Sequence, residues 1–185
     1  MSKNVYLVHG WEGKPDNHWF PWLTWELKTR GFEVYSLTMP SPAEPKVSEW
    51  IAEIKNIVGR PNKDTYFVGH SLGCLAILRY FEKLPKTARV GGAVFVAGFL
   101  SSLSISAIEE FCTPPLDVEK AKKHCERVVT IFSDNDGYVS MERSLEFQKA
   151  LGAKGILERG KGHFTKSEGA DALPSVFKSI VSFSE

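Results

Sequence analysis

The sequence has no long hydrophobic run and no excess of charge of either sign. Its longest mostly apolar stretch, residues 91–100, is half of the roughly 20 residues that a membrane-spanning helix needs. Only four apolar residues separate Asn4 from His9, which is too short for a signal peptide. Lys and Arg number 23 against 22 Asp and Glu, so no global field would hold nucleic acid or an anionic membrane. We expect neither partner, and we expect a cytoplasmic protein.

Signals for disulfides, metals and cofactors are also lacking. The three cysteines (Cys74, Cys112 and Cys125) are odd in number and show no C-x-x-C spacing, which argues against a disulfide framework or zinc site and favours a reducing compartment. There is no H-E-x-x-H motif, and no G-x-G-x-x-G follows a strand. Residues 155–161 read G-x-x-x-x-G-K, but Gly162 replaces the Ser or Thr of a phosphate loop. We expect no metal and no cofactor.

Short β-type runs alternate with helical patterns along the 185 residues, which favours one α/β domain spanning residues 1–185. Several of the runs are continuously apolar, as in parallel strands covered by helices on both faces. The expected strands are 5–8, 33–37, 65–68, 93–97, 128–132 and 155–157. The expected helices are 22–30, 50–58, 72–84, 140–151 and 171–183.

The stretch from Phe99 to Leu116 fits neither period. It mixes apolar residues with four serines, and it follows a strand. We expect a loop with about one helical turn. Loops at the carboxyl ends of parallel strands line ligand clefts, and Phe99 and Leu100 are candidate substrate contacts. An ordinary surface connection is the alternative.

Residues 69–73, Gly-His-Ser-Leu-Gly, match the G-x-S-x-G motif between a predicted strand and a predicted helix. A sharp turn at this place strains the backbone of the serine and projects its Oγ into a cleft. The two glycines allow the strand and the helix to approach closely. Ser71 is therefore the candidate nucleophile, and a plain capping serine is the alternative.

A serine hydroxyl needs a general base, and two histidines follow Ser71 in the sequence. His124 lies in a charged helix end and is expected to be a solvated surface residue. His163 lies in a glycine-bearing loop after the last strand, where an imidazole can reach the sheet edge. His163 is the candidate base, and a structural loop histidine is the alternative. His9 and His70 are expected to be scaffold residues whose ring nitrogens are hydrogen-bonded.

Asp134 and Asp136 both follow the strand at 128–132, and either could orient the histidine. Asp134 is close enough to the strand to cap a turn. Asp136 lies further into the loop and precedes Gly137, so it can turn back toward His163. Position alone favours Asp136 only slightly.

The second part of an oxyanion-binding site is expected after the first strand, where Gly10 allows close approach to a substrate. The donors would be the backbone N–H groups of Trp11 and Leu72. A turn that merely ends the strand is the alternative. Among the nearby aromatics, Trp11 and Trp19 are candidates for a cleft wall. Trp22 and Trp25 are expected to be core contacts of the first helix. His18 is expected at the surface, although it could touch substrate.

The motifs together resemble the small serine-hydrolase branch of the α/β-hydrolase superfamily, which includes the retinoblastoma-binding-protein-nine-like and YdeN-like proteins. The resemblance covers nearly the whole chain: His9-Gly10, Trp19-Phe20-Pro21-Trp22, residues 69–73, Ala97-Gly98, residues 134–139 and Gly162-His163-Phe164. It implies a three-layer α/β-hydrolase fold with about six mostly parallel strands in the order 2-1-3-4-5-6 and no large lid. It also favours Asp136 as the acid, although Gly137 replaces a proline common in the family.

These residues predict a cofactor-free serine hydrolase that cleaves small carboxylic esters, or less readily amides, through an acyl-enzyme. Ser71 would attack, His163 would move the proton, and Asp136 would orient His163. A protein-binding module on the same scaffold is the alternative. A monomer is slightly favoured.

Overall fold

The computed structural model describes residues 2–185 and contains one six-stranded sheet. The strands follow the order β2-β1-β3-β4-β5-β6, and every neighbouring pair is parallel. The six strands predicted from the sequence and the strand order implied by the family resemblance are both confirmed. The strands are β1 (Lys3–Val8), β2 (Phe32–Ser36), β3 (Thr65–His70), β4 (Gly92–Val96), β5 (Val128–Phe132) and β6 (Lys154–Leu157).

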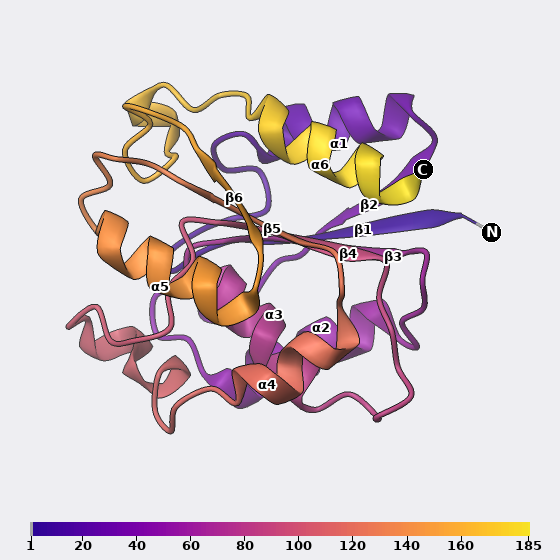
Figure 1. The fold of residues 1–185 in the computed structure, drawn as a ribbon, viewed down its shortest axis with the longest axis horizontal. Helices are drawn as coiled ribbons and strands as arrows, with labels where there is room; N and C mark the ends of the chain where they lie inside the picture. Colours follow the sequence, from indigo (N-terminus) through magenta and orange to yellow (C-terminus); the bar gives the residue numbers. More distant parts are fainter. Residues whose placement is uncertain (1) are drawn as a thin grey trace.

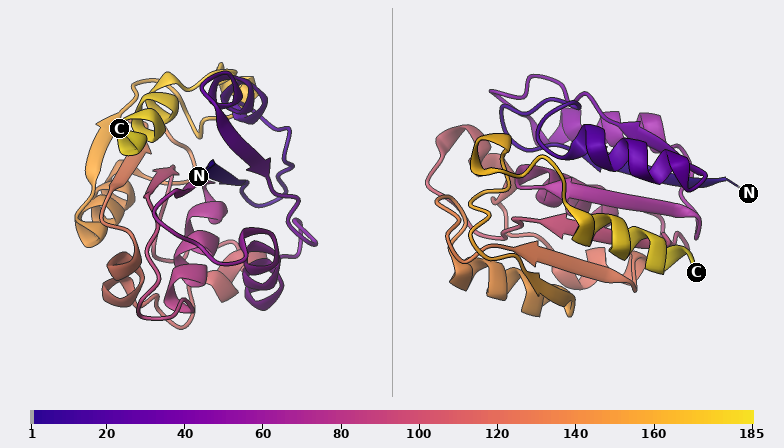
Figure 2. Two further views of the ribbon diagram at one scale, coloured as in Figure 1. Left: turned by 90° about the vertical axis from the view of Figure 1, so that its right-hand side faces the viewer. Right: turned by 90° about the horizontal axis from the view of Figure 1, so that it is seen from above.

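Helices cover both faces of the sheet and make three layers. Helices α1 and α6 pack together on one face, and α2, α3, α4 and α5 lie on the other (Figure 1). Figure 2 shows the same layers from two further directions. The helices are α1 (Phe20–Thr29), α2 (Val47–Val58), α3 (Leu72–Glu82), α4 (Val118–Ala121), α5 (Met141–Leu151) and α6 (Pro174–Ser184). No helix among residues 2–185 is long and apolar enough to cross a membrane.

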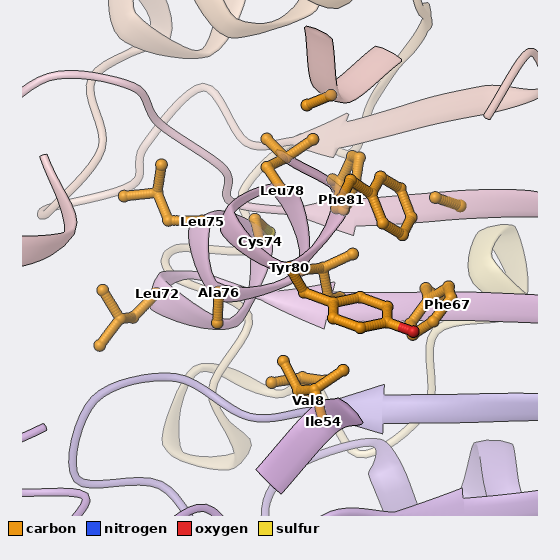
Figure 3. Packing of buried hydrophobic residues seen from close by; sticks show 14 of the residues in the cluster. Val8, Ile54, Phe67, Leu72, Cys74, Leu75, Ala76, Leu78, Tyr80 and Phe81 are labelled. Atoms are coloured by element: carbon orange, nitrogen blue, oxygen red, sulfur yellow. The ribbon is translucent and has the colours of Figure 1, made fainter. Parts of the chain in front are cut away.

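Helix α3 lies at the centre of one core because apolar residues surround it on every side. All of its residues from Leu72 to Phe81 are buried. Figure 3 shows side chains of β1, α2 and β3 gathered around this helix. The burial fixes the start of α3, and therefore position 71, against the carboxyl ends of β1 and β3.

The aromatic residues of α1 differ in part from the prediction. Its buried face contains Phe20, Leu23 and Leu27, and Trp22 packs edge-on against Phe177. The prediction that Trp25 contacts the core is wrong, because Trp25 is 64% exposed. A residue two positions beyond Leu23 falls on the opposite side of the helix.

Because all six strands are parallel, their carboxyl ends meet at one edge of the sheet. This edge collects the loops after β1, β3, β4, β5 and β6. The stretch 99–116 belongs to it and contains a 3₁₀ helix, Ser106–Phe111, which at three residues per turn makes about two turns where one was expected. The opposite edge holds the loops that lead from helices into strands.

Candidate active site

Ser71 lies in the sharp turn between β3 and α3. Its backbone has φ 53° and ψ −119°, a conformation that costs a non-glycine residue on the order of 1–3 kcal/mol. The surrounding glycines make the turn possible: a Cβ at Gly69 would lie 2.8 Å from the amide nitrogen of Cys74, and one at Gly73 would lie 2.7 Å from the carbonyl oxygen of His9. The Ser71 N–H donates to the carbonyl of Val96 at 2.9 Å. The strain is therefore held in place by the sheet.

His163 and Asp136 come together from the loops after β6 and β5. The Nδ1 of His163 lies 2.8 Å and 3.0 Å from the two carboxylate oxygens of Asp136. The Asp136 side chain is 2% exposed and also accepts the N–H groups of Tyr138 and Val139. A carboxylate at Nδ1 holds the proton on that nitrogen, which leaves the lone pair on Nε2. His163 Nε2 has no hydrogen-bond partner among residues 2–185, and His163 lines the same cavity as Ser71.

Asp134 has a different environment from Asp136. Its carboxylate accepts the N–H of Gly160 at 2.8 Å and the Nη1 of Arg159 at 3.0 Å. These bonds lower the pKa of the Asp134 carboxyl, and the hydrogen bond from Gly160 has the largest effect. Asp134 thus ties the loop after β5 to the loop after β6, and it does not contact His163.

The loop that carries His163 is fixed by two further side chains. His70, directly before Ser71, donates from Nε2 to the carbonyl of His163 at 2.8 Å. Burial, followed by the neighbouring His163, lowers the pKa of His70 well below its ordinary value, so the ring is neutral at physiological pH. Glu168 Oε2 accepts the N–H of His163 at 2.9 Å and the Thr165 hydroxyl at 2.6 Å.

His9 and His18 also lie at the cavity. His9 Nδ1 donates to the carbonyl of Gly10 at 2.8 Å, and its Nε2 accepts the N–H of Met39 at 3.2 Å. The expectation of hydrogen-bonded ring nitrogens is confirmed for both nitrogens of His9 and for Nε2 of His70. His18 Nδ1 accepts the N–H of Lys166, and burial, followed by His163, lowers the pKa of His18.

The two amides expected to bind an oxyanion belong to Trp11, in the loop after β1, and to Leu72, which directly follows Ser71. Leu72 is the first residue of α3, so its N–H belongs to the donors that a helix leaves free. Neither amide donates to any turn, loop or cap carbonyl within residues 2–185. A Cβ on Gly10 would lie 3.1 Å from the Cβ of Ser71, which shows how closely the first loop passes the serine.

A cavity of about 160 Å³ opens over Ser71 and His163. An engineered apolar cavity of about 150 Å³ holds a benzene molecule, so the space suits a small group. The stretch 99–116 does line the cleft, which decides between the two alternatives left open by the sequence. The walls are apolar at Trp11, Phe20, Leu103, Ile105, Ile108 and Tyr138, and polar at Glu12, Lys14, Asn17, His18 and Thr165.

The structure does not place three of the expected substrate contacts in the cavity wall. Trp19 is fully buried and packs edge-on against Phe20, and Phe99 is fully buried in the core around α3. Leu100 is half-buried against the same core. Trp19 lies at the i−4 position of Leu23, so it shares the buried face of α1. Phe99 follows the central strand β4 too closely to leave the core.

His124 was expected in solvent, and that prediction is wrong. The residue is 3% exposed, and its Nδ1 lies 2.9 Å from the carbonyl of Ala88. The loop before β4 covers it. Charged neighbours in sequence therefore misled the prediction, because His124 faces inward at the end of its helical turn.

The sequence reasoning missed Tyr138 as a part of the site. Its ring lies 4.8 Å from the His163 ring, centroid to centroid, although Tyr138 is 59% exposed. Its position two residues after Asp136, in a loop at the cleft edge, was the available signal. Phe20, Leu103, Ile105 and Ile108 had no such signal, because each belongs to an apolar pattern typical of packing.

The sequence and the fold both match known proteins. A family model described as serine hydrolase matches residues 5–182. Putative hydrolase YdeN of Bacillus subtilis (strain 168) is 33% identical over 99% of this chain and 97% of its own. Serine hydrolase RBBP9 of Rattus norvegicus is 26% identical over 81% of this chain and 80% of its own. The crystal structure of the B. subtilis ydeN gene product superposes with a TM-score of 0.94, covering 98% of both chains. Polyneuridine aldehyde esterase, 12% identical with a TM-score of 0.68 over the full length of both chains, shares the fold. The chain belongs to the serine hydrolase family and has the α/β-hydrolase fold.

Proposed function

We propose that this protein hydrolyses small carboxylic esters through an acyl-enzyme, with Ser71, His163 and Asp136 as its catalytic triad. The observation that carries the proposal is the bond from His163 Nδ1 to the buried Asp136 carboxylate. It leaves Nε2 as a base in the small cavity that also holds the strained Ser71.

In the first half-reaction, Ser71 Oγ attacks the ester carbonyl while His163 Nε2 accepts the hydroxyl proton. The imidazolium that forms is stabilised by Asp136, which itself stays ionised. The tetrahedral intermediate collapses, the alkoxide leaves with the proton from Nε2, and the acyl group remains on Ser71. A water molecule then gives a proton to Nε2 and attacks the acyl carbon. When this second tetrahedral intermediate collapses, the bond to Ser71 Oγ breaks, Nε2 returns the proton to Oγ, and the acid is released.

The negative oxygen of each tetrahedral intermediate would be bound by the N–H groups of Trp11 and Leu72. Donors of this kind are worth about 10²–10³ in rate each when they are already in place. Their lack of other acceptors and the closeness of Gly10 to Ser71 support the assignment. The apolar wall formed by Leu103, Ile105 and Ile108 suits the hydrocarbon part of a short acyl or alcohol group.

Labelling with a fluorescent fluorophosphonate, beside hydrolysis of p-nitrophenyl acetate, tests the proposal. The wild type is expected to be labelled and active, and Ser71→Ala is expected to lose both while keeping its circular dichroism spectrum. Ser182→Ala, an exposed serine on α6, is the matched control and should behave as the wild type. A folded wild type that neither labels nor turns over would favour a binding module on this scaffold.

A further inference from the structure

A second and larger cavity lies at the sheet edge opposite Ser71. It is a groove of about 1110 Å³ that runs along α2 from Ser48 to Lys55, beside the carboxyl end of α3 and the loops 59–63 and 83–89. The groove shares no lining residue with the cavity over Ser71. Figure 2 (left) views the molecule from the groove side, and α2 and α3 lie beside each other there. The groove is therefore independent of the proposed ester hydrolysis.

The charged side chains that line the groove all carry the same sign. Five cations line it, Lys55, Arg60, Lys63, Lys83 and Arg89, and it has no acidic residue in its walls. All five are exposed, and within residues 2–185 none of them forms an ion pair. The whole chain has a net charge of only +1, so this is a local concentration of positive charge.

Nearby acidic residues do not neutralise the groove. Glu82 pairs with Arg79 and accepts the N–H of Asp117, which turns its carboxylate toward α4. Asp64 follows Lys63 in sequence but is not in the groove wall. Among the five cations, only Arg89 forms side-chain hydrogen bonds within residues 2–185, and it donates them to the carbonyls of Lys86 and Ala88.

The groove also has an apolar part. Ile51 and Ala52 of α2 face Leu84 and Pro85, which follow α3, and the Tyr80 ring lines the space between them. A ligand complementary to this surface needs several negative charges and at least one apolar group. The volume exceeds the range of roughly 300–1,000 Å³ typical of small-molecule pockets.

The groove combines cations with an apolar surface, and this combination indicates what kind of anion fits. A phosphate carries negative charge but no apolar group, so it would leave Ile51 and Leu84 uncovered. An acidic peptide supplies carboxylates for the cations and apolar side chains for this surface.

We propose that this groove binds an acidic, partly apolar segment of a partner protein. Carboxylates of the segment pair with Arg60, Lys63 and Lys83, and an apolar side chain packs on Ile51 and Leu84. The segment leaves the cavity over Ser71 free, so a bound partner and substrate can occupy the protein together.

Fluorescence anisotropy with a labelled synthetic peptide of alternating glutamate and leucine tests the proposal on the full chain. The wild type is expected to bind it, with affinity that falls steeply as salt rises. The double variant Arg60→Glu, Lys63→Glu should lose at least tenfold in affinity. The matched control Lys28→Glu, Lys149→Glu changes the same charge at exposed positions on α1 and α5 and should bind as the wild type.

Three outcomes would overturn the proposal: no binding to the wild type, equal loss in both double variants, or equal binding of a peptide with glutamine in place of glutamate. Tighter binding of single-stranded RNA, a polyphosphate or phosphatidylserine vesicles would show that the groove binds that ligand and not an acidic peptide. Hydrolysis of p-nitrophenyl acetate serves as the folding control, and both double variants should keep the wild-type rate. Thermal unfolding serves the same purpose if the wild type proves inactive.

Discussion

At the scale of single residues, the two aspartates after β5 have separate tasks although they lie two positions apart. Asp136→Asn should keep the shape of the site but favour the wrong imidazole tautomer of His163, a change that costs about 10⁴ in kcat in a well-studied triad. Asp134→Asn should cost less than about tenfold, because Asp134 bonds only to Arg159 and Gly160. Ester hydrolysis and thermal unfolding of both variants check this.

The double variant controls for rescue of one carboxylate by the other. If Asp134→Asn shows the larger loss of kcat, with its fold intact, the proposed acid is wrong.

His70 predicts how stability depends on pH. Its folded pKa is lowered by burial, so below about pH 6.5 the unfolded chain binds a proton that the folded chain does not. The contribution of neutral His70 to the free energy of unfolding is therefore complete above pH 6.5. It should decrease by about 1.4 kcal/mol per pH unit as the pH drops below 6.5. Urea unfolding at pH 5.0, 6.0 and 7.5 measures the slope. His70→Gln, whose amide can still donate to His163, should show a flatter slope whatever its absolute stability.

At the scale of elements, the loop after β6 depends on one carboxylate. Glu168 Oε2 accepts the N–H groups of His163 and Thr165 and the Thr165 hydroxyl, so it fixes the backbone that carries the proposed base. Glu168→Ala leaves these donors unpaired, and we expect a loss of about 1–3 kcal/mol of stability together with a lower kcat. Glu168→Gln keeps an acceptor oxygen and should recover most of both.

The readout that separates positioning from mere stability is kcat measured well below the unfolding temperature. A Glu168→Ala variant that is destabilised but keeps the wild-type kcat would show that the loop holds His163 without this side chain.

At the scale of the whole molecule, the small cavity and the absence of a large inserted lid in residues 2–185 predict the substrate size. The connections at the Ser71 edge within residues 2–185 contain no domain-sized insertion, and the longest, 97–117, lines the cavity with Leu103, Ile105 and Ile108. Activity should be highest for acetate to butyrate esters and should fall by more than about tenfold for long acyl chains that the cavity cannot bury. A series of p-nitrophenyl esters measures this. A jump in activity at the micelle threshold of a substrate would contradict it.

The sequence by itself determined the succession of strands and helices along the chain, the turn that carries Ser71 and the choice of His163 over His124, because these depend on local signals. The elbow glycines, the apolar period of each helix and the loop glycines beside His163 are all read from neighbours in the chain. The strand order and the preference for Asp136 came from the family resemblance. Position in the sequence alone did not decide whether Asp134 or Asp136 orients His163.

Only the tertiary structure decided which side chains share a cavity. Trp19 and Trp11 are equally aromatic, yet Trp19 is buried beneath α1 while Trp11 lines the site. Phe99 was expected in the wall that Ile105 forms, and His124 was expected in solvent but is covered by the loop before β4. The groove cations come from one helix and two loops and show no pattern in the sequence. Such groupings depend on helix rotation and loop path, which are set by packing between segments that are distant along the chain.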